Sequence, residues 1–409
     1  MKCGLLGRKL GHSYSPAIHS CFGDYPYELF EKEPGQLEAF LRGGDWDGLN
    51  VTMPYKKAVI DHLDQLTPVA QKLGSVNTVV RRAGKLIGHN TDYFGFQNLV
   101  RKSNLRPGGK KCLILGSGGA SNTAVAVLKE MGADVVVISR SGDNNYGNLE
   151  QHKDAAMIVN TTPVGMYPNT GVSTVDLTLF PLLEGVVDLV YNPSRTQLLL
   201  DAEQLGIPAF GGLAMLVAQA KAASEWFTGL RLPDSEIERV LGIMRKQMEN
   251  IVLIGMPGCG KSTIGRLLAR SCEKSFVDAD EEIEKLANKS IPQIFAEDGE
   301  DAFRVWETKI LSELGKQSCL VIATGGGCVT RAENYHLLHQ NGTIYWLQRD
   351  IEKLPKDGRP LSIDLEAMYR VREPMYAAFA DYVIDNNGSL EEVIPAIGDC
   401  HASVRTGSQ

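Results

Sequence analysis

The 409-residue sequence predicts an α/β fold, because short runs rich in branched residues alternate with longer amphipathic segments along the chain. Two glycine-rich loops, at 115–121 and 255–263, each stand between a predicted strand and a predicted helix. The chain is also about two to three times as long as the roughly 150 residues of a typical domain. We therefore expect two α/β bodies, each with a nucleotide-type loop.

Composition is typical of a globular protein, with 43% hydrophobic and 22% charged residues. The 42 Lys and Arg against 49 Asp and Glu give a net charge of -7, which predicts neither nucleic-acid nor membrane binding. Eight cysteines form no CxxC pair and no zinc-like spacing, and no signal peptide or membrane-length apolar run is found. These features predict a soluble cytoplasmic protein.

The first nucleotide-type unit is predicted as a strand over 113–115, a helix over 120–131 and a strand over 135–139. Between the first strand and the helix, the loop LGSGGAS can bring backbone N–H groups against a pyrophosphate. Ser121 replaces the third glycine of GxGxxG, so the loop alone is equally typical of a structural turn.

The second strand of this unit ends in Ser139, Arg140 and Ser141, where an acidic residue would bind the ribose of NAD. Arg140 can instead form charge-assisted bonds to a 2′-phosphate, which favours NADP. The alternative is that Arg140 is a solvated surface charge.

Three polar clusters precede this unit. Ser13 and Ser15 stand before a proline that can start a helix, Thr52 and Lys56 flank a proline-containing turn, and Asp92 stands at a predicted helix start. Taken singly, the serines and Asp92 are typical helix caps, and Lys56 is a typical solvent-facing lysine.

Taken together, eight ordered motifs make residues 1–247 resemble shikimate dehydrogenase: GHSYSP, NVTMPYK, SVNTV, GHNTD, GSGGAS, NTTPVGM, DLVYNP and GGLAMLVAQA. The resemblance implies an α/β substrate-binding part, formed by 1–100 with the C-terminal helices of 212–247, and a Rossmann NADP-binding part at 101–211. It implies that Lys56 and Asp92 form the catalytic pair.

The resemblance also implies the remaining contacts of this site. The substrate carboxylate would be held by Ser13, Ser15 and Tyr191, and the substrate hydroxyls would be approached by Thr52, Asn77, Asp92 and Gln219. The NADP-binding residues would be Gly116, Ser117, Gly118, Gly119, Ala120, Ser139, Arg140, Ser141, Asn160, Thr161, Leu189 and Gly212.

Two residues depart from the family pattern. The family often has a second basic residue a few positions after the one that stands here as Arg140, but Ser141-Gly-Asp-Asn144 contains none, which narrows the expected preference for NADP over NAD. Ala214 stands where a glycine is common, which removes no functional side chain.

Two predicted helices, over 213–228 and from Asp234 or Ser235 to about Lys246, close the front half, so the domain boundary is expected at 246–250. The second body begins with a strand over 251–254, a helix over 261–271 and a strand over 276–278. Between the first strand and the helix, GMPGCGKST matches GxxxxGK[ST] in full.

This phosphate loop predicts ATP binding by a P-loop domain. Its backbone N–H groups cradle phosphates, Lys261 reaches the β and γ positions, and Ser262 can bind magnesium. Asp278 can support the magnesium and Asp280 can orient a substrate hydroxyl, although either could simply cap the following helix. Three glycines at 325–327 follow the predicted strand 320–323 and would let a substrate approach the backbone.

With Arg304, Arg359 and Arg372, which singly would be read as surface residues, these motifs make residues 250–397 resemble shikimate kinase, with a tail over 398–409 expected to be flexible. The resemblance implies that Arg304, Gly326 and Arg372 bind the shikimate carboxylate side, and that Asp280 holds the reacting hydroxyl. Arg359, with Lys261, would neutralise charge on the transferred phosphoryl group. The ATP-binding set would be Gly258, Cys259, Gly260, Lys261, Ser262, Thr263 and Arg359, with Mg²⁺ at Ser262 and Asp278.

The sequence therefore predicts a bifunctional enzyme that reduces 3-dehydroshikimate with NADPH and phosphorylates the resulting shikimate with ATP. One alternative is a dehydrogenase for quinate that uses NAD, fused to the same kinase. Another is a shikimate-sensing regulator without turnover, against which the intact set of Lys56, Asp92, Lys261, Asp280 and Arg359 argues.

Overall fold

The computed structural model describes residues 1–11, 13–355 and 365–403. Contacts between Cα atoms divide the chain into two compact units. The first unit comprises Met1–Met166, Val172–Tyr191 and Asp201–Met244, and the second comprises Tyr167–Gly171, Asn192–Leu200 and Arg245–Gln409. Each unit is described by itself.

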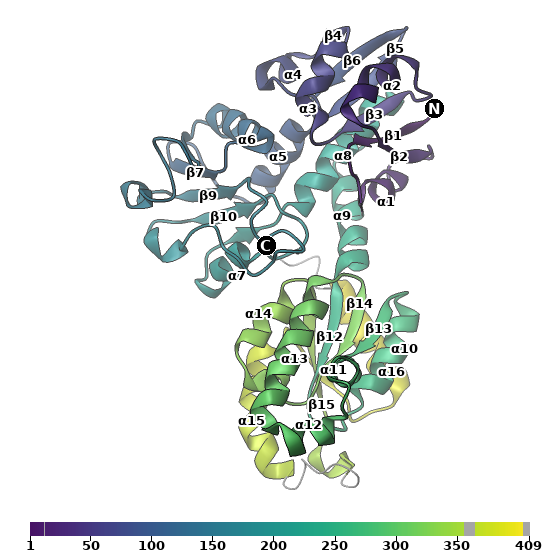
Figure 1. The fold of residues 1–409 in the computed structure, drawn as a ribbon, viewed down its shortest axis with the longest axis vertical. Helices are drawn as coiled ribbons and strands as arrows, with labels where there is room; N and C mark the ends of the chain where they lie inside the picture. Colours follow the sequence, from purple (N-terminus) through teal and green to yellow (C-terminus); the bar gives the residue numbers. More distant parts are fainter. Residues whose placement is uncertain (12, 356–364, 404–409) are drawn as a thin grey trace. The chain divides into compact units, whose positions relative to one another are not determined.

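The first unit opens with a six-stranded sheet in the order β2-β1-β3-β5-β6-β4 (Figure 1). β5 runs antiparallel to both of its neighbours, and the other pairs are parallel. The strands are β1 (Cys3–Gly7), β2 (Tyr27–Glu31), β3 (Gly48–Val51), β4 (Gln65–Leu66), β5 (Thr78–Arg82) and β6 (Lys85–His89). The associated helices are α1 (Ser15–Ser20), α2 (Leu37–Gly43), α3 (Tyr55–Ala58), α4 (Pro68–Leu73) and α5 (Asp92–Lys102).

A second sheet in the same unit is entirely parallel, in the order β11-β10-β9-β7-β8. Its strands are β7 (Lys111–Leu115), β8 (Asp134–Ile138), β9 (Met157–Asn160), β10 (Gly185–Asp188) and β11 (Ala209–Phe210). The helices are α6 (Gly119–Glu130) and α8 (Leu213–Thr228), together with α7 (Gln197–Gln204) and α9 (Ser235–Met248), whose residues are divided between the two units after Leu200 and after Met244. The predicted βαβ unit at 113–139 is therefore confirmed as β7-α6-β8. A parallel sheet places the loops at the carboxyl ends of its strands along one edge, where nucleotides bind.

The second unit has a five-stranded parallel sheet in the order β13-β14-β12-β15-β16. The strands are β12 (Asn250–Ile254), β13 (Ser275–Asp278), β14 (Leu320–Ala323), β15 (Gly342–Gln348) and β16 (Tyr382–Asp385). In Figure 1, α10 and α16 lie on one side of the sheet and α13 and α14 on the other. The helices are α10 (Lys261–Ser271), α11 (Ala279–Ala287), α12 (Ile291–Glu297), α13 (Gly299–Lys316), α14 (Glu333–His339), α15 (Leu365–Phe379) and α16 (Leu390–Ser403).

Short 3₁₀ turns connect several of these elements. They lie at Pro34–Gln36, Val59–His62, Leu149–His152, Leu177–Leu179, Cys328–Thr330 and Ile351–Lys353.

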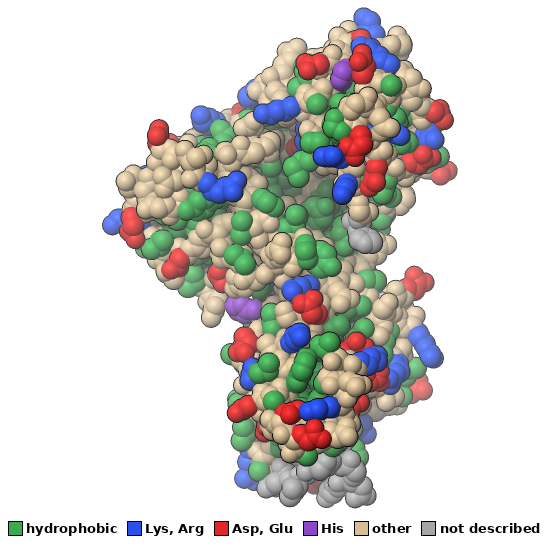
Figure 2. All heavy atoms as spheres, in the orientation of Figure 1, with side chains coloured by type: hydrophobic (Ala, Val, Ile, Leu, Met, Phe, Trp, Pro, Cys, Tyr) green, Lys and Arg blue, Asp and Glu red, His purple; other side chains and the backbone are tan. Residues whose placement is uncertain are grey.

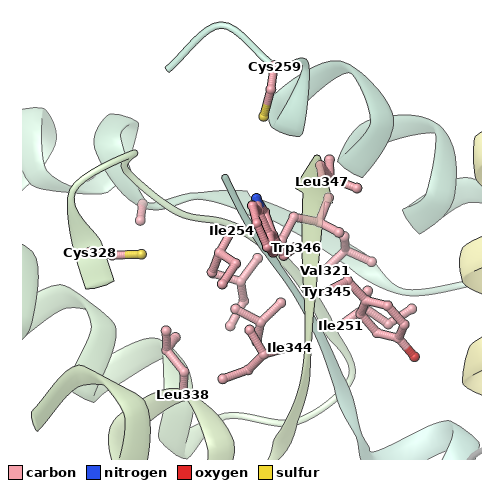
Figure 3. Packing of buried hydrophobic residues seen from close by; sticks show 14 of the residues in the cluster. Ile251, Ile254, Cys259, Val321, Cys328, Leu338, Ile344, Tyr345, Trp346 and Leu347 are labelled. Atoms are coloured by element: carbon pink, nitrogen blue, oxygen red, sulfur yellow. The ribbon is translucent and has the colours of Figure 1, made fainter. Parts of the chain in front are cut away.

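The central strands of the second unit are buried on both faces, as expected for a parallel sheet covered by helices. All five residues of β12 are buried, and its four apolar side chains, at 251–254, pack with those of β14 and β15 (Figure 3). This core fixes the strand that leads directly into the phosphate loop. The α/β class predicted for both halves is confirmed.

The C-terminal boundary differs from the prediction. Instead of a flexible tail from 398, α16 continues to Ser403, because Ile397 and His401 are buried and anchor its last turns. His401 Nδ1 lies 3.2 Å from the hydroxyl oxygen of Tyr345 in β15.

Basic and acidic side chains alternate over the face drawn in Figure 2, in keeping with the small net charge of the chain. No helix within the described ranges is long and apolar enough to cross a membrane.

Candidate active sites

The first site is centred on an ion pair between a lysine and an aspartate 36 positions apart in the sequence. Lys56 lies on α3, just after the turn that follows β3, and Asp92 begins α5. Lys56 Nζ donates to Asp92 Oδ2 at 2.6 Å, and Asn77 Nδ2 donates to Asp92 Oδ1 at 2.9 Å. Both oxygens of the carboxylate are therefore engaged, which fixes its plane and the position of the ammonium group.

A cavity of about 360 Å³ opens beside this pair, which is large enough for a small ring acid. All eight residues predicted to contact the substrate or act on it line the cavity: Ser13, Ser15, Thr52, Lys56, Asn77, Asp92, Tyr191 and Gln219. Three predicted cofactor residues also line it, namely Ala120, Leu189 and Gly212. Asn50 and Met215 line the cavity as well and were not predicted, although both lie inside the motifs NVTMPYK and GGLAMLVAQA.

One part of the cavity wall carries hydroxyl groups suited to a carboxylate. The backbone N–H of Ser15 donates to Ser13 Oγ at 3.2 Å, which holds the two serines side by side at the start of α1. The Tyr191 ring packs edge-on against Tyr14, with ring centroids 6.2 Å apart. Burial raises the pKa of Tyr191, so its hydroxyl stays neutral and can donate a hydrogen bond.

The glycine loop between β7 and α6 has the close packing that a dinucleotide loop requires. Gly116 has φ of +107°, and a Cβ there would lie 2.9 Å from Thr161 Oγ1. At Gly118 and Gly119 a Cβ would meet no atom of the described residues within 4 Å, so the first turn of α6 is open to a phosphate group. Gly212 packs against the Leu189 backbone, where a Cβ would lie 2.2 Å from the carbonyl oxygen. These residues fit a bound NADP.

Arg140 is the second residue after the end of β8. Its side chain is exposed, as are those of Ser141 and Asp143. The exposed guanidinium stands at the end of the strand next to β7, where a 2′-phosphate would be recognised. Asn160 ends β9 and donates to Asp188 at 3.0 Å, so its side chain braces two strand ends. Its Oδ1 also accepts from the backbone N–H of Thr162 at 3.0 Å, which shapes the segment after Thr161.

The second site begins at the phosphate loop between β12 and α10. Gly255, Gly258 and Gly260 all have positive φ, at +143°, +82° and +100°, which is a backbone path that only glycine follows without strain. Lys261 begins α10, and its ammonium group donates to the carbonyl oxygens of Gly255 and Met256 at 2.9 and 3.0 Å. The lysine is thus held under the loop, within reach of phosphates that the loop cradles.

Ser262 and Asp278 form the pair predicted for magnesium. Ser262 Oγ donates to Asp278 Oδ2 at 2.6 Å. A hydroxyl and a carboxylate at this spacing fit Mg²⁺, which takes few protein ligands and completes its shell with water and substrate phosphates. The described residues contain no cluster of three or more His, Cys, Asp or Glu side chains arranged for a metal.

Asp280 is the most perturbed acid of this site. Its Oδ1 is inaccessible to solvent and has no hydrogen-bond partner among the residues that the structure describes. Burial, followed by the neighbouring Asp278 carboxylate, raises the pKa of Asp280 to about 6. A carboxylate with an unused oxygen and a pKa close to neutrality is suited to accept a hydrogen bond or a proton from a substrate hydroxyl.

Two arginines face the same cavity. Arg304 on α13 is held by Glu307, which is fully buried, and by Glu300, with both bonds at 2.8 Å. Arg372 on α15 donates to the carbonyl oxygen of Gly326 at 3.1 Å. Sequence reasoning missed Glu307, although its position three residues after Arg304 on a helix was a usable signal.

A cavity of about 1020 Å³ in the second unit is lined by residues between Pro257 and Arg372. The predicted residues among them are Gly258, Gly260, Lys261, Ser262, Thr263, Asp278, Asp280, Arg304, Gly326 and Arg372. The Cys259 side chain is buried in the hydrophobic core, so the prediction that this residue binds ATP concerns its backbone alone (Figure 3). Arg359 lies outside the described residues.

Family models match both ends of the chain. Residues 5–79 match the model described as the shikimate dehydrogenase substrate binding domain. Residues 257–400 match the model described as shikimate kinase.

Individual relatives match the front part over almost their whole length. A shikimate dehydrogenase (NADP(+)) of Clostridium perfringens is 35% identical over 259 residues, which cover 58% of this chain and 96% of the relative. One of Symbiobacterium thermophilum is 36% identical over 263 residues and is covered to 90%.

Solved structures agree with these relatives. The Thermus thermophilus shikimate 5-dehydrogenase in complex with NADP(H) and shikimate is 32% identical, with a TM-score of 0.53, covering 59% of this chain and 98% of that one. A chorismate mutase/shikimate 5-dehydrogenase fusion protein of Clostridium acetobutylicum is 33% identical, with a TM-score of 0.58 and coverages of 60% and 97%.

Proposed function

Because the chain belongs to the shikimate dehydrogenase family and carries a shikimate kinase domain at its C-terminal end, we propose that it catalyses two consecutive reactions. The first is the reversible, NADPH-dependent reduction of 3-dehydroshikimate to shikimate. The second is the ATP-dependent phosphorylation of shikimate to shikimate 3-phosphate. The product of the first reaction is the acceptor of the second, which gives a chemical reason for the fusion.

In the first site NADPH, when bound, supplies the hydride. Lys56 lies on the cavity wall and is positioned by Asp92, so its ammonium group can give a proton to the oxygen of the substrate carbonyl as negative charge develops there. In the reverse direction the lysine accepts the proton from the substrate hydroxyl. Ser13, Ser15 and Tyr191 would hold the substrate carboxylate, which fixes the ring relative to Lys56.

Thr52, Asn77 and Gln219 would hold the ring hydroxyls. The cofactor would lie along Gly116, Ser117, Gly118, Gly119 and Ala120, with Ser139, Arg140 and Ser141 at its 2′-phosphate and Asn160, Thr161, Leu189 and Gly212 toward its nicotinamide.

In the second site Mg-ATP, when bound, supplies the phosphoryl group. Asp280 accepts a hydrogen bond from the reacting hydroxyl of shikimate, which orients its oxygen and withdraws its proton. Arg304, Arg372 and the Gly326 backbone bind the carboxylate side of the acceptor. Lys261 neutralises charge on the transferred group, and we assign the same role to Arg359 by resemblance.

The observation that carries this proposal is the convergence of all eight substrate residues on one cavity around the Lys56–Asp92 pair. Neither alternative from the sequence is favoured. The relatives described above are NADP-dependent shikimate dehydrogenases, which speaks against an NAD-dependent quinate enzyme. A sensor without turnover would not need a fixed Lys56–Asp92 pair.

We further propose that the dehydrogenase occupies residues 1–247 and the kinase residues 250–397. The cytoplasmic location predicted from cysteine usage stays a prediction.

The direct experiment incubates the purified protein with 3-dehydroshikimate, NADPH, ATP and magnesium. Loss of NADPH absorbance and formation of shikimate 3-phosphate are both expected. Loss of NADPH without the phosphate would refute the kinase assignment, and turnover of neither substrate would refute both assignments.

A further inference from the structure

We propose that Thr91, which is fully buried behind the first cavity, is a positioning residue that sets the orientation of two substrate-binding amides, Asn77 and Gln219. The inference rests on the dehydrogenase function proposed above and assigns it a residue that does not itself line the cavity. Thr91 precedes Asp92 at the start of α5.

A backbone N–H group, which can only donate a hydrogen bond, fixes the orientation of the Asn77 amide. The backbone N–H of Thr91 donates to Asn77 Oδ1 at 2.7 Å, so the oxygen of that amide must face Thr91. The Thr78 hydroxyl donates to the same oxygen at 3.0 Å. The two lone pairs of this oxygen are then used, and Asn77 Nδ2 is left to face Asp92 Oδ1 at 2.9 Å and Thr91 Oγ1 at 3.0 Å.

The same threonine hydroxyl controls Gln219. Thr91 Oγ1, which accepts from Asn77 Nδ2, lies 3.2 Å from Asn77 Oδ1, 3.1 Å from Thr78 Oγ1 and 3.4 Å from Gln219 Oε1. Because Asn77 Oδ1 already accepts from the Thr91 backbone and from Thr78, we assign the proton of the Thr91 hydroxyl to Gln219 Oε1. Gln219 Nε2 donates one N–H to the carbonyl oxygen of Leu216 at 2.9 Å. The second N–H of Gln219, whose side chain lines the cavity, is left for the substrate.

These hydrogen bonds leave one donor beside one acceptor on the cavity wall. Gln219 offers an N–H group and Asp92 offers a carboxylate, so the pair matches a substrate hydroxyl, which can accept from one and donate to the other. If either amide rotated by 180°, a carbonyl oxygen would take the place of the N–H and would repel the carboxylate or the hydroxyl oxygen. Thr91 therefore acts on substrate recognition through its neighbours.

The test compares Thr91→Val with wild-type protein in the oxidation of shikimate by NADP⁺. Valine keeps the shape of threonine and the backbone N–H but removes the hydroxyl that bridges the two amides. The backbone N–H that orients Asn77 is retained, so the effect falls mainly on Gln219. We expect the KM for shikimate to rise about tenfold, because the hydroxyl's hydrogen bonds to Gln219 Oε1 and from Asn77 Nδ2 are both lost. The KM for NADP⁺ and the rate of shikimate phosphorylation should stay unchanged, because neither involves these amides.

Matched variants separate this role from simple packing. Thr91→Ser restores the hydroxyl and should bring the KM to within about twofold of wild type. Thr78→Val removes only one of two donors to Asn77 Oδ1 and should have a smaller effect, about two- to threefold. In a Gln219→Leu background, Thr91→Val should lose part of its effect, since one of its targets is gone.

A wild-type KM for shikimate in Thr91→Val, or failure of Thr91→Ser to restore it, would overturn the proposal. Equal changes in the KM values for shikimate and NADP⁺ would do the same, because they would indicate general disorder of the unit. If Thr91→Val does not fold, Thr78→Val and Thr91→Ser are compared with wild type instead. A two- to threefold higher KM for shikimate in Thr78→Val, with a KM within about twofold of wild type in Thr91→Ser, would support the proposal; an unchanged KM in Thr78→Val would overturn it. Absence of shikimate oxidation by the wild-type protein would instead refute the dehydrogenase function itself.

Discussion

Replacing Asp280 by Asn should stabilise the unliganded second unit while abolishing phosphorylation. Asp280 lies at the wall of the kinase cavity, where one oxygen of its carboxylate has no hydrogen-bond partner within the described part of the chain, and its pKa is raised to about 6 from the ordinary value of 3.8. Ionising it in the folded chain therefore costs free energy that the unfolded chain does not bear. An amide of the same shape carries no such cost.

The magnitude follows from proton linkage. Between pH 3.8 and about 6 the folded state binds more protons at Asp280 than the unfolded state does, so the free energy of unfolding falls as pH rises through this window. A difference of about two pKa units corresponds to about 3 kcal/mol, which is fully present above pH 6. Asp280→Asn should thus match wild type below pH 3.8 and exceed it by about 3 kcal/mol at pH 7.5.

Hydrogen exchange of the β12 amides (Asn250–Ile254), followed by mass spectrometry over a urea series at pH 4 and pH 7.5, measures the stability of this unit within the full chain. Glu313→Gln is a suitable control, since Glu313 is 63% exposed and its surface pair with Lys316 should contribute less than about 1 kcal/mol. Phosphorylation by Asp280→Asn should fall at least about 10²-fold. Equal stabilities of Asp280→Asn and wild type at pH 7.5 would refute the reasoning.

Three further predictions concern both sites. Lys56→Ala should slow 3-dehydroshikimate reduction about 10²- to 10⁴-fold and leave phosphorylation intact, and Lys261→Ala should do the reverse; a variant that stops both reactions would show coupling between them. Arg140→Ala should raise the KM for NADPH about tenfold or more without changing that for NADH, because only NADPH carries the 2′-phosphate; equal effects on both cofactors would contradict this role. Glu307→Gln should raise the KM for shikimate but not for ATP in the kinase assay, since the buried Arg304 loses its anionic partner; an unchanged KM would show that Arg304 is positioned without the Glu307 charge.

Sequence reasoning identified most of the polar residues that line the first cavity, because these residues lie in short motifs whose spacing is local. The motif around Lys56 and the motif around Asp92 each identify one residue of the pair. Neither motif shows that Lys56 Nζ and Asp92 Oδ2 lie 2.6 Å apart. That contact forms only in the folded unit, where the segment after β3 is brought beside the start of α5. The role of Thr91 was invisible for the same reason, since it depends on Gln219, 128 positions later.

In the second unit the sequence alone determined the phosphate loop, because the positive φ values at Gly255, Gly258 and Gly260 are a local property of glycine. It also determined the α/β class, which follows from the periodicity of apolar residues. Only the tertiary structure decided that Cys259 turns into the core and that Glu307 is buried against Arg304. Burial and the pKa of Asp280 depend on which side chains from distant elements surround a group, and that is set by packing in three dimensions rather than by neighbours along the chain.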